Sequence, residues 1–217
     1  MQQQSHSIAN IRRDYKLQTL SEEEVAVSPF LQFSKWWNEA VESHIDEVNA
    51  MTLATVDSAG NPHARIVLLK DYDENGFVFF TNYNSNKGKE MENNPNVSLV
   101  FFWKELERQV RIEGSVTKIA AAKSDEYFFS RPAGSRIGAW ASPQSSVITS
   151  RKVIEDNFLI TEQKFGSEQI PRPEHWGGYI VAPDCFEFWQ GRSSRLHDRI
   201  RYKSSINGSW KVERLAP

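Results

Sequence analysis

Cysteine, long apolar runs and excess charge are all scarce in this sequence. Cys185 is the only cysteine among 217 residues, so the chain can form neither an intramolecular disulfide nor a cysteine-ligated metal cluster, and a reducing compartment is expected. No apolar run approaches the roughly 20 residues that a membrane-spanning helix needs, and residues 1–6 contain no apolar stretch typical of a signal peptide. These absences predict a soluble, cytoplasmic protein in which Cys185 is a small buried residue of a strand.

The balance of charge and the scattered histidines exclude further classes of protein. With 26 basic and 28 acidic residues the formal net charge is -2, so the chain has no global positive field that would hold nucleic acid. His6, His63 and His175 lie in separate segments without a partner at ligand spacing, and no metal site is expected. The sequence also contains no G-x-S-x-G, P-loop or G-x-G-x-x-G motif.

Hydrophobic residues are plentiful enough for one sizeable core. They make up 39% of the sequence, and aromatic residues make up 12%, which is compatible with a single folded domain. Ser28 followed by proline predicts the start of a helix. Phe30, Phe33, Trp37 and Val41 then recur at helical spacing, so this face is expected to pack on a sheet.

Periodicity and turn residues place the remaining elements. Further helices are predicted from a cap at Asn84 or Ser85 through Glu92, through 125–129 and from about 146 to 165. The last of these is expected to bury Val153, Ile154, Phe158, Leu159 and Ile160. Period-two patterns predict strands over 51–56, 63–72, 77–81, 97–103, 108–118, 176–181, 185–190 and 210–215, the first three forming a meander. Many short antiparallel strands with a few helices predict an α+β, mainly β, fold: an antiparallel, Greek-key-like barrel with flanking helices.

A cationic group near the C-terminus is the most informative pattern. After the strand 185–190 and a turn, Arg195, His197 and Arg199 fall at i, i+2 and i+4, which predicts a second strand with all three side chains on one face. A planar ligand that bears a phosphate would suit two guanidiniums and an imidazole. The alternative, left open by spacing alone, is a solvated edge strand whose arginines pair with Glu187 or Asp198.

The same stretch carries a family resemblance. The run EFWQ at 187–190, followed after four residues by RLHDR at 195–199, resembles the C-terminal signature of the pyridoxamine (pyridoxine) 5′-phosphate oxidases. The final residues, ERLAP at 213–217, resemble that family's terminus, and matching blocks begin at about Arg12. The resemblance therefore covers nearly the whole chain.

The resemblance implies a fold and an activity. The fold would be an FMN-binding split β-barrel, with residues 1–27 as a mobile lid segment and 28–217 as the barrel domain, including the C-terminal dimerisation and substrate-binding region. A homodimer would carry two FMN sites at the subunit interface, built from both chains. The reaction would oxidise pyridoxamine 5′-phosphate and pyridoxine 5′-phosphate to pyridoxal 5′-phosphate. Hydride would pass from substrate C4′ to flavin N5, and O2 would be reduced to H2O2, with ammonia released from the amine.

The family's cofactor motifs fall on several blocks of this chain. By resemblance the FMN-binding residues are Arg65, Ile66, Val67, Leu68, Leu69, Lys70, Phe80, Thr81, Ser85, Lys87, Gln109, Gln144, Ser145, Trp189 and Arg199, with Arg65 on the FMN phosphate. Read from spacing alone, Arg65 and Lys70 leave opposite faces of a regular strand, so a shared pocket requires a bulge or a ligand that spans an edge. Ser85 and Lys87 at a helix start make a phosphate cradle, or only a capped surface helix.

The substrate motifs are carried over in the same way. They are Arg12, Arg13, Asp14, Tyr15, Lys70, Tyr127, Arg131, Ser135, Arg195, Leu196 and His197. Lys70, Tyr127, Arg131 and Ser135 would hold the substrate phosphate, and Arg195 and His197 would be catalytic, orienting and polarising the reacting carbon. The sequence departs from the family at Phe80 in place of a frequent tyrosine, at Asn86 in place of arginine, and at Arg136 in place of glutamine. Two alternatives stay open: a related split-barrel flavoenzyme acting on another aromatic substrate, and a non-catalytic protein that binds FMN or pyridoxal phosphate.

Overall fold

The computed structural model describes residues 13–166, 169–205 and 207–217. Their contacts divide the chain into two compact units. Unit 1 comprises the described parts of Met1–Val48, Phe102–Arg111 and Cys185–Pro217, and unit 2 comprises Asn49–Phe101 and the described parts of Ile112–Asp184. The boundaries between the units fall inside three strands, Asn96–Trp103, Arg108–Lys118 and Trp176–Gln190.

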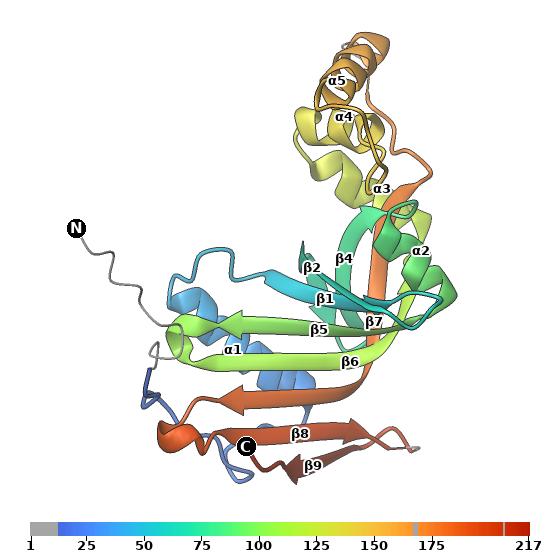
Figure 1. Ribbon diagram of the computed structural model, residues 1–217. Helices are drawn as coiled ribbons and strands as arrows, with labels where there is room; N and C mark the ends of the chain where they lie inside the picture. Colours follow the sequence, from blue (N-terminus) through green and yellow to red (C-terminus); the bar gives the residue numbers. More distant parts are fainter. Residues whose placement is uncertain (1–12, 167–168, 206) are drawn as a thin grey trace, which may run out of the picture. The chain divides into compact units, whose positions relative to one another are not determined.

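Within the described residues, nine strands belong to one sheet (Figure 1). They are β1 (Ala50–Val56), β2 (Pro62–Leu68), β3 (Asp71–Asp73), β4 (Gly76–Asn82), β5 (Asn96–Trp103), β6 (Arg108–Lys118), β7 (Trp176–Gln190), β8 (Asp198–Ser204) and β9 (Trp210–Arg214). The strand order is β2-β1-β5-β6-β7-β4-β3, with β8 paired to β7 and β9 paired to β8. The helices are α1 (Pro29–Glu42), α2 (Asn86–Asn93), α3 (Ala121–Ser130), α4 (Ala133–Ala141) and α5 (Lys152–Phe165). The predicted α+β, mainly β, antiparallel architecture is confirmed.

Helix α1 of unit 1 begins as the sequence predicts, but its buried face is rotated. The Ser28 side chain accepts a hydrogen bond from the Phe30 amide, which caps the first turn. Phe33 and Trp36 are buried, and Trp36 packs edge-on against Phe188 of β7 with ring centroids 5.3 Å apart. The prediction for Val41 was wrong, since its side chain is 48% exposed. The buried stripe therefore follows the spacing 33, 36 and 40 instead of 33, 37 and 41.

In unit 2, the predicted strand over 63–72 is interrupted. Strand β2 ends at Leu68, where its pairing with Ala50 of β1 stops, and the Lys70 amide donates instead to Val78 of β4 over 2.9 Å. The chain changes hydrogen-bonding partner at this point, so the predicted meander is wrong. Two separate hairpins, β1–β2 and β3–β4, replace it, with β2 and β3 at the two ends of the strand order.

The second half of unit 2 also departs from the sequence prediction. Helix α4 was not predicted, α5 begins at residue 152 instead of 146, and β7 runs without the expected break between 181 and 185. Leu159 and Ile160, expected to be buried, are 53% and 64% exposed. The side of α5 that packs inward carries Phe158 and Phe165, seven residues apart, so Leu159 and Ile160 point away from it.

Helices α3, α4 and α5 close around one aromatic cluster. Phe128 of α3, Ile137 of α4, Ile170 and Trp176 at the start of β7 are buried together. Figure 1 shows the three helices side by side in yellow and orange. Cys185 is buried, as predicted. In the described ranges, none of the helices is both long and apolar enough to cross a membrane.

Candidate functional site

A cavity of about 630 Å³ opens in unit 2 beside the end of β2. Its lining residues are Arg65, Ile66, Val67, Leu68, Lys70, Phe80, Thr81, Asn82, Lys87, Tyr127, Arg131, Ser135, Gly138, Ala139, Ser142, Gln144 and Trp176. Both Arg65 and Lys70 face it, because β2 ends between them and the five-residue spacing no longer separates their side chains. The cavity thus gathers most of the residues predicted for this unit.

One polar group of the cavity lies where β4 meets α2. Ser85, one of the two candidate caps, caps α2 by accepting a hydrogen bond from the Gly88 amide. The Lys87 ammonium and the Thr81 hydroxyl both donate to Oε1 of Gln144, over 3.2 and 3.3 Å. Free helix amides, a hydroxyl and a lysine are the groups that bind phosphate. Ser85 itself is buried behind this surface.

Arg65 is held by a buried carboxylate that sequence reasoning missed. Glu90 of α2 contacts the guanidinium over 3.0 Å and the Thr55 hydroxyl over 2.5 Å, and His63 Nδ1 lies 2.7 Å from its other oxygen. Burial acts to raise the pKa of Glu90, but the hydrogen bonds from Thr55, His63 and Arg65 outweigh burial and hold the pKa below its usual value. Glu90 is therefore a carboxylate that fixes the Arg65 side chain.

Lys87 is electrostatically strained in this arrangement. Burial and the nearby positive charge of Arg65 lower the pKa of Lys87, and the Glu90 carboxylate offsets only part of this effect. A bound anion between the two cations would remove the strain, since it favours the charged lysine.

The second polar group of the cavity surrounds Arg131. Its guanidinium lies over the Trp176 ring at 4.5 Å, and its NH1 atom is buried without a hydrogen-bond partner among the described residues. Burial lowers the pKa of Arg131, and Tyr127 opposes that effect. Tyr127 stacks on Phe80 with ring centroids 3.9 Å apart. Ser135 lies in the first turn of α4, where a loop was predicted, and still faces the cavity.

The predicted strand face at Arg195, His197 and Arg199 does not exist. Residues Ser193–Arg195 form a 3-10 turn, and β8 begins only at Asp198. Ser194 and Arg195 have φ angles of 57° and 62°. For residues other than glycine this left-handed conformation costs about 1–2 kcal/mol each, so the loop must be held by surrounding contacts.

The three residues have different surroundings in unit 1. Arg199 donates to Glu187 over 2.7 Å and to the Ala216 carbonyl over 2.8 Å, which is the ion pair that the alternative interpretation of this strand expects. Arg195 is exposed and forms no hydrogen bond or ion pair with any described residue. His197 is half-buried, and burial followed by the charge of Arg195 lowers its pKa, while Asp198 opposes the change.

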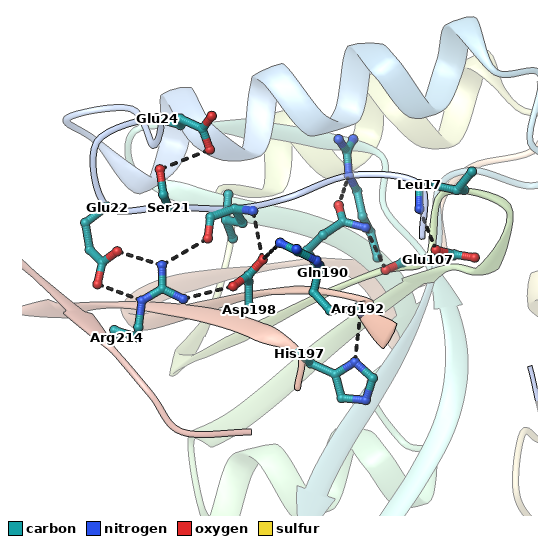
Figure 2. A network of polar contacts seen from close by, with 12 residues as sticks. Leu17, Ser21, Glu22, Glu24, Glu107, Gln190, Arg192, His197, Asp198 and Arg214 are labelled. Atoms are coloured by element: carbon teal, nitrogen blue, oxygen red, sulfur yellow. Dashed lines mark hydrogen bonds and ion pairs between the residues drawn. The ribbon is translucent and has the colours of Figure 1, made fainter. Parts of the chain in front are cut away.

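His197 belongs to an aromatic group with Tyr15 and Trp189. Its ring centroid lies 4.6 Å from that of Trp189 and 6.0 Å from that of Tyr15. A Cβ atom at Gly191 would lie 2.8 Å from Cγ of Tyr15, so only glycine admits the tyrosine this close. Figure 2 shows the Arg192 amide pointing at the His197 ring, with the Arg192 nitrogen 3.1 Å from Nδ1.

Charged side chains hold the segment before α1, residues 16–22, by hydrogen bonds and an ion pair (Figure 2). Glu107 accepts hydrogen bonds from the amides of Lys16 and Leu17, over 2.9 and 3.1 Å. Asp198 accepts one from the Leu20 amide over 3.1 Å, and Arg214 contacts Glu22 over 2.6 Å. The predicted lid residue Tyr15 thus lies against His197, whereas the predicted lid residue Arg12 lies outside the described residues.

The remaining predicted residues are less engaged. Leu69 is buried and Ser145 is an exposed turn residue, and neither faces the cavity. Gln109 is partly buried in β6, and Leu196 is exposed. Arg13 contacts Glu107 over 3.4 Å, and Asp14 contacts Lys16 over 3.0 Å.

The three positions at which the sequence departs from the family pattern differ in their surroundings. Phe80 lines the cavity, whereas Asn86 and Arg136 do not. Across the described ranges, no three His, Cys, Asp or Glu side chains gather in a way that could hold a metal ion.

Comparison with known families shows to which family the chain belongs. The family model described as pyridoxamine 5′-phosphate oxidase matches residues 37–164, and the model described as the pyridoxine 5′-phosphate oxidase C-terminal dimerisation region matches residues 176–217. The chain belongs to the pyridoxamine 5′-phosphate oxidase family. It is accordingly an oxidoreductase of that family, as the C-terminal signature suggested.

Individual relatives support membership of the oxidase family. The pyridoxine/pyridoxamine 5′-phosphate oxidase of Trichormus variabilis is 55% identical over 97% of this chain and 99% of its own length. The enzyme of the same name from Bordetella pertussis is 56% identical over 97% and 100%.

Solved structures confirm the split-barrel fold expected for the family. PhzG from Burkholderia lata, solved with tetrahydrophenazine-1-carboxylic acid, has a TM-score of 0.84 at 28% identity and covers 90% of this chain and 95% of its own. A pyridoxamine 5′-phosphate oxidase-related, FMN binding protein from Nostoc punctiforme has a TM-score of 0.70 at 16% identity and covers 89% and 100%. The second likeness supports the fold alone.

Proposed function

We propose that this chain oxidises pyridoxamine 5′-phosphate and pyridoxine 5′-phosphate to pyridoxal 5′-phosphate, using FMN and O2 and releasing H2O2, with ammonia from the amine. The observation that carries the proposal is one cavity with two separate groups of side chains that can bind an anion. Lys87 with Thr81 and Arg65 forms one, and Arg131 with Tyr127 forms the other. A cofactor and a substrate that each bear a phosphate would use both.

The residues present fit the phosphate end of FMN. Arg65 is fixed by Glu90, and Lys87 stands at the start of α2. A bound anion would offset the burial and the Arg65 charge that lower the pKa of Lys87. Within the described sheet β2 pairs only with β1, so its other edge offers free amides and carbonyls to a polar ring system. FMN, when bound, supplies the acceptor for hydride, and Gln109, Gln144, Ser145, Trp189 and Arg199 are proposed to contact its ring.

The second group fits the substrate phosphate. A guanidinium with a buried, unsatisfied NH1 atom is costly unless an acceptor arrives, and a phosphate oxygen supplies one. We assign Lys70, Tyr127, Arg131 and Ser135 to this role. Arg195 and His197, presented by the loop before β8, orient the pyridine ring and polarise the reacting carbon. The matched dimerisation region supports a homodimer, in which two FMN sites at the interface draw on both chains.

Lys87 makes cofactor affinity depend on pH. Its phosphate contact requires the charged ammonium, and its pKa is lowered by burial and by the charge of Arg65, so FMN affinity should fall as pH rises toward the ordinary lysine pKa of about 10.4, already below that pH. Titration of the apoprotein with FMN, followed by quenching of flavin fluorescence, measures the dissociation constant at each pH. Lys87→Arg keeps its charge throughout this range and should abolish the dependence. An equal loss of affinity in both proteins would contradict the assignment.

The activity itself is tested with the purified chain in air. A flavin absorption spectrum, followed by peroxide formation on addition of pyridoxamine 5′-phosphate, is the expected result. A yellow protein that forms no peroxide with either phosphorylated vitamer would sink the proposal in favour of a binding protein. Turnover of a different aromatic compound, for which the ligand of the PhzG structure suggests a first probe, would favour the related flavoenzyme.

A further inference from the structure

We propose that Arg192 and Asp198 are positioning residues that hold His197 as the tautomer with its proton on Nε2. This inference deepens the proposed function and rests on it, because it concerns how a proposed catalytic side chain is presented. All the contacts that carry it lie within unit 1, and Figure 2 draws the polar contacts of Arg192, His197 and Asp198.

The tautomer follows from the partner of the imidazole. The nitrogen of the Arg192 amide lies 3.1 Å from Nδ1 of His197, and a backbone N–H can only donate. Nδ1 must therefore accept, and a neutral imidazole that accepts at Nδ1 carries its proton on Nε2. His197 is then prepared to donate a hydrogen bond from Nε2, the role of an electrophile that polarises a substrate oxygen or nitrogen.

Protonation of His197 would break this contact. The imidazolium has two N–H groups, so Nδ1–H would face the Arg192 N–H. The charged groups near the ring are Arg195 on the same loop, which opposes a positive imidazole, and Asp198 on β8, which favours it. Tyr15 from the N-terminal segment and Trp189 from β7 add uncharged ring surface.

The Arg192 amide keeps its direction toward His197 because the Arg192 side chain is held by an ion pair. Its guanidinium donates to Oδ2 of Asp198 over 2.8 Å, and Asp198 is itself fixed as the β8 residue that pairs with Gln190. Next to it, the Gly191 amide donates to the Glu107 carbonyl over 2.7 Å. Between these anchors Ser194 and Arg195 adopt left-handed backbone conformations, which a free loop of these residues would leave.

Asp198 also receives the N-terminal segment. The same carboxylate accepts from the Leu20 amide and from Arg214, which in turn contacts Glu22. The hydrogen bonds from Leu20, Arg192 and Arg214 hold the pKa of Asp198 below its usual value although burial acts to raise it. One carboxylate thus joins the segment that carries Tyr15 to the loop that carries His197.

The test is a nitrogen NMR spectrum of the full chain as purified, in which the chemical shifts of Nδ1 and Nε2 of His197 are measured. The protein has 5 histidines, so the His197 signals are assigned by their loss in His197→Asn. In the wild type, Nδ1 should show the shift of an unprotonated acceptor and Nε2 that of a protonated nitrogen. In Arg192→Ala and Asp198→Asn both shifts should move toward the average of two exchanging tautomers. The kcat/KM for pyridoxamine 5′-phosphate should fall about tenfold with FMN still bound, the size expected from one lost hydrogen bond.

Two further variants complete the experiment. Arg192→Lys keeps a cation within reach of Asp198 and should restore the wild-type shifts in part. Glu213→Gln breaks the comparable pair with Arg201 on the β8–β9 hairpin and should leave them unchanged. If Arg192→Ala does not fold, Asp198→Asn carries the same expectation. Wild-type shifts in both variants overturn the proposal, whatever happens to activity. Full turnover by His197→Asn would instead sink the catalytic role of His197 and leave the tautomer result standing.

Discussion

Replacing Arg195 with leucine should leave FMN bound and reduce kcat for pyridoxamine 5′-phosphate by about 10²–10³-fold, the usual cost of removing one group that stabilises developing charge. The side chain is exposed and forms no hydrogen bond or ion pair with a described residue, so its loss removes no such bond from the fold. Its backbone nevertheless adopts a left-handed conformation, with φ of 62°, which the loop maintains at an energetic cost. A strained residue with a free guanidinium is best explained by a ligand that uses it.

The measurement separates cofactor binding from turnover. The flavin spectrum and FMN dissociation constant of Arg195→Leu should match the wild type, because Arg65, Thr81 and Lys87 are untouched. Arg151→Leu is the matched control, since Arg151 is also an exposed arginine and its described partner is Glu155, one turn along α5. That variant should keep full activity. Wild-type kcat in Arg195→Leu would remove Arg195 from the reaction.

Signals that act over a few residues were readable from the sequence. Ser28 before proline predicted a cap that the structure confirms, because a cap depends only on the next turn. Asn84 and Ser85 were both candidate caps of α2, and the structure shows Ser85 in that role. The alternation in residues 108–118 predicted β6 with its observed bounds. Asn207 followed by Gly208 is a pair typical of a hairpin turn, and Gly208, between β8 and β9, has the left-handed φ of 78° that such a turn uses.

Features that depend on distant contacts were not readable. Leu68 to Lys70 looks like a continuous strand, and Leu69 still donates to Asn49 beside β1, but the Lys70 amide donates to Val78 of β4 and the strand breaks there. The strand predicted to begin at Arg195 is a turn there, because contacts from Glu107 and Asp198 hold the loop in which Ser194 and Arg195 are left-handed. Neither Ser194 nor Arg195 is glycine, so the sequence does not signal this conformation. Local patterns carry no trace of such partners.

The candidate cavity shows the same division. Its cations are predicted by the family resemblance, whereas spacing alone places Arg65 and Lys70 on opposite faces of a regular strand. Glu90, which fixes Arg65 from 25 positions away, had no signal, because an acidic residue on a polar helix usually faces solvent. Trp176 was expected only as the start of a strand, yet its ring is the surface on which Arg131 lies.

Arg131→Leu should raise KM for pyridoxamine 5′-phosphate by about 100-fold, since hydrogen bonds to a charged group contribute about 1.5–3 kcal/mol. Leucine can still cover the Trp176 ring, and the buried NH1 atom that lacks a partner disappears, so the fold should be as stable as the wild type. Pyridoxamine without its phosphate is the internal control, because it never makes the contact and should react equally poorly with both proteins. Ser135→Ala removes a neutral hydroxyl from the same cavity and should raise KM by about tenfold or less. A variant that loses activity toward both compounds equally would show that Arg131 acts elsewhere than on the phosphate. Steady-state kinetics with the two substrates therefore decide which of the cavity's two polar groups receives the substrate.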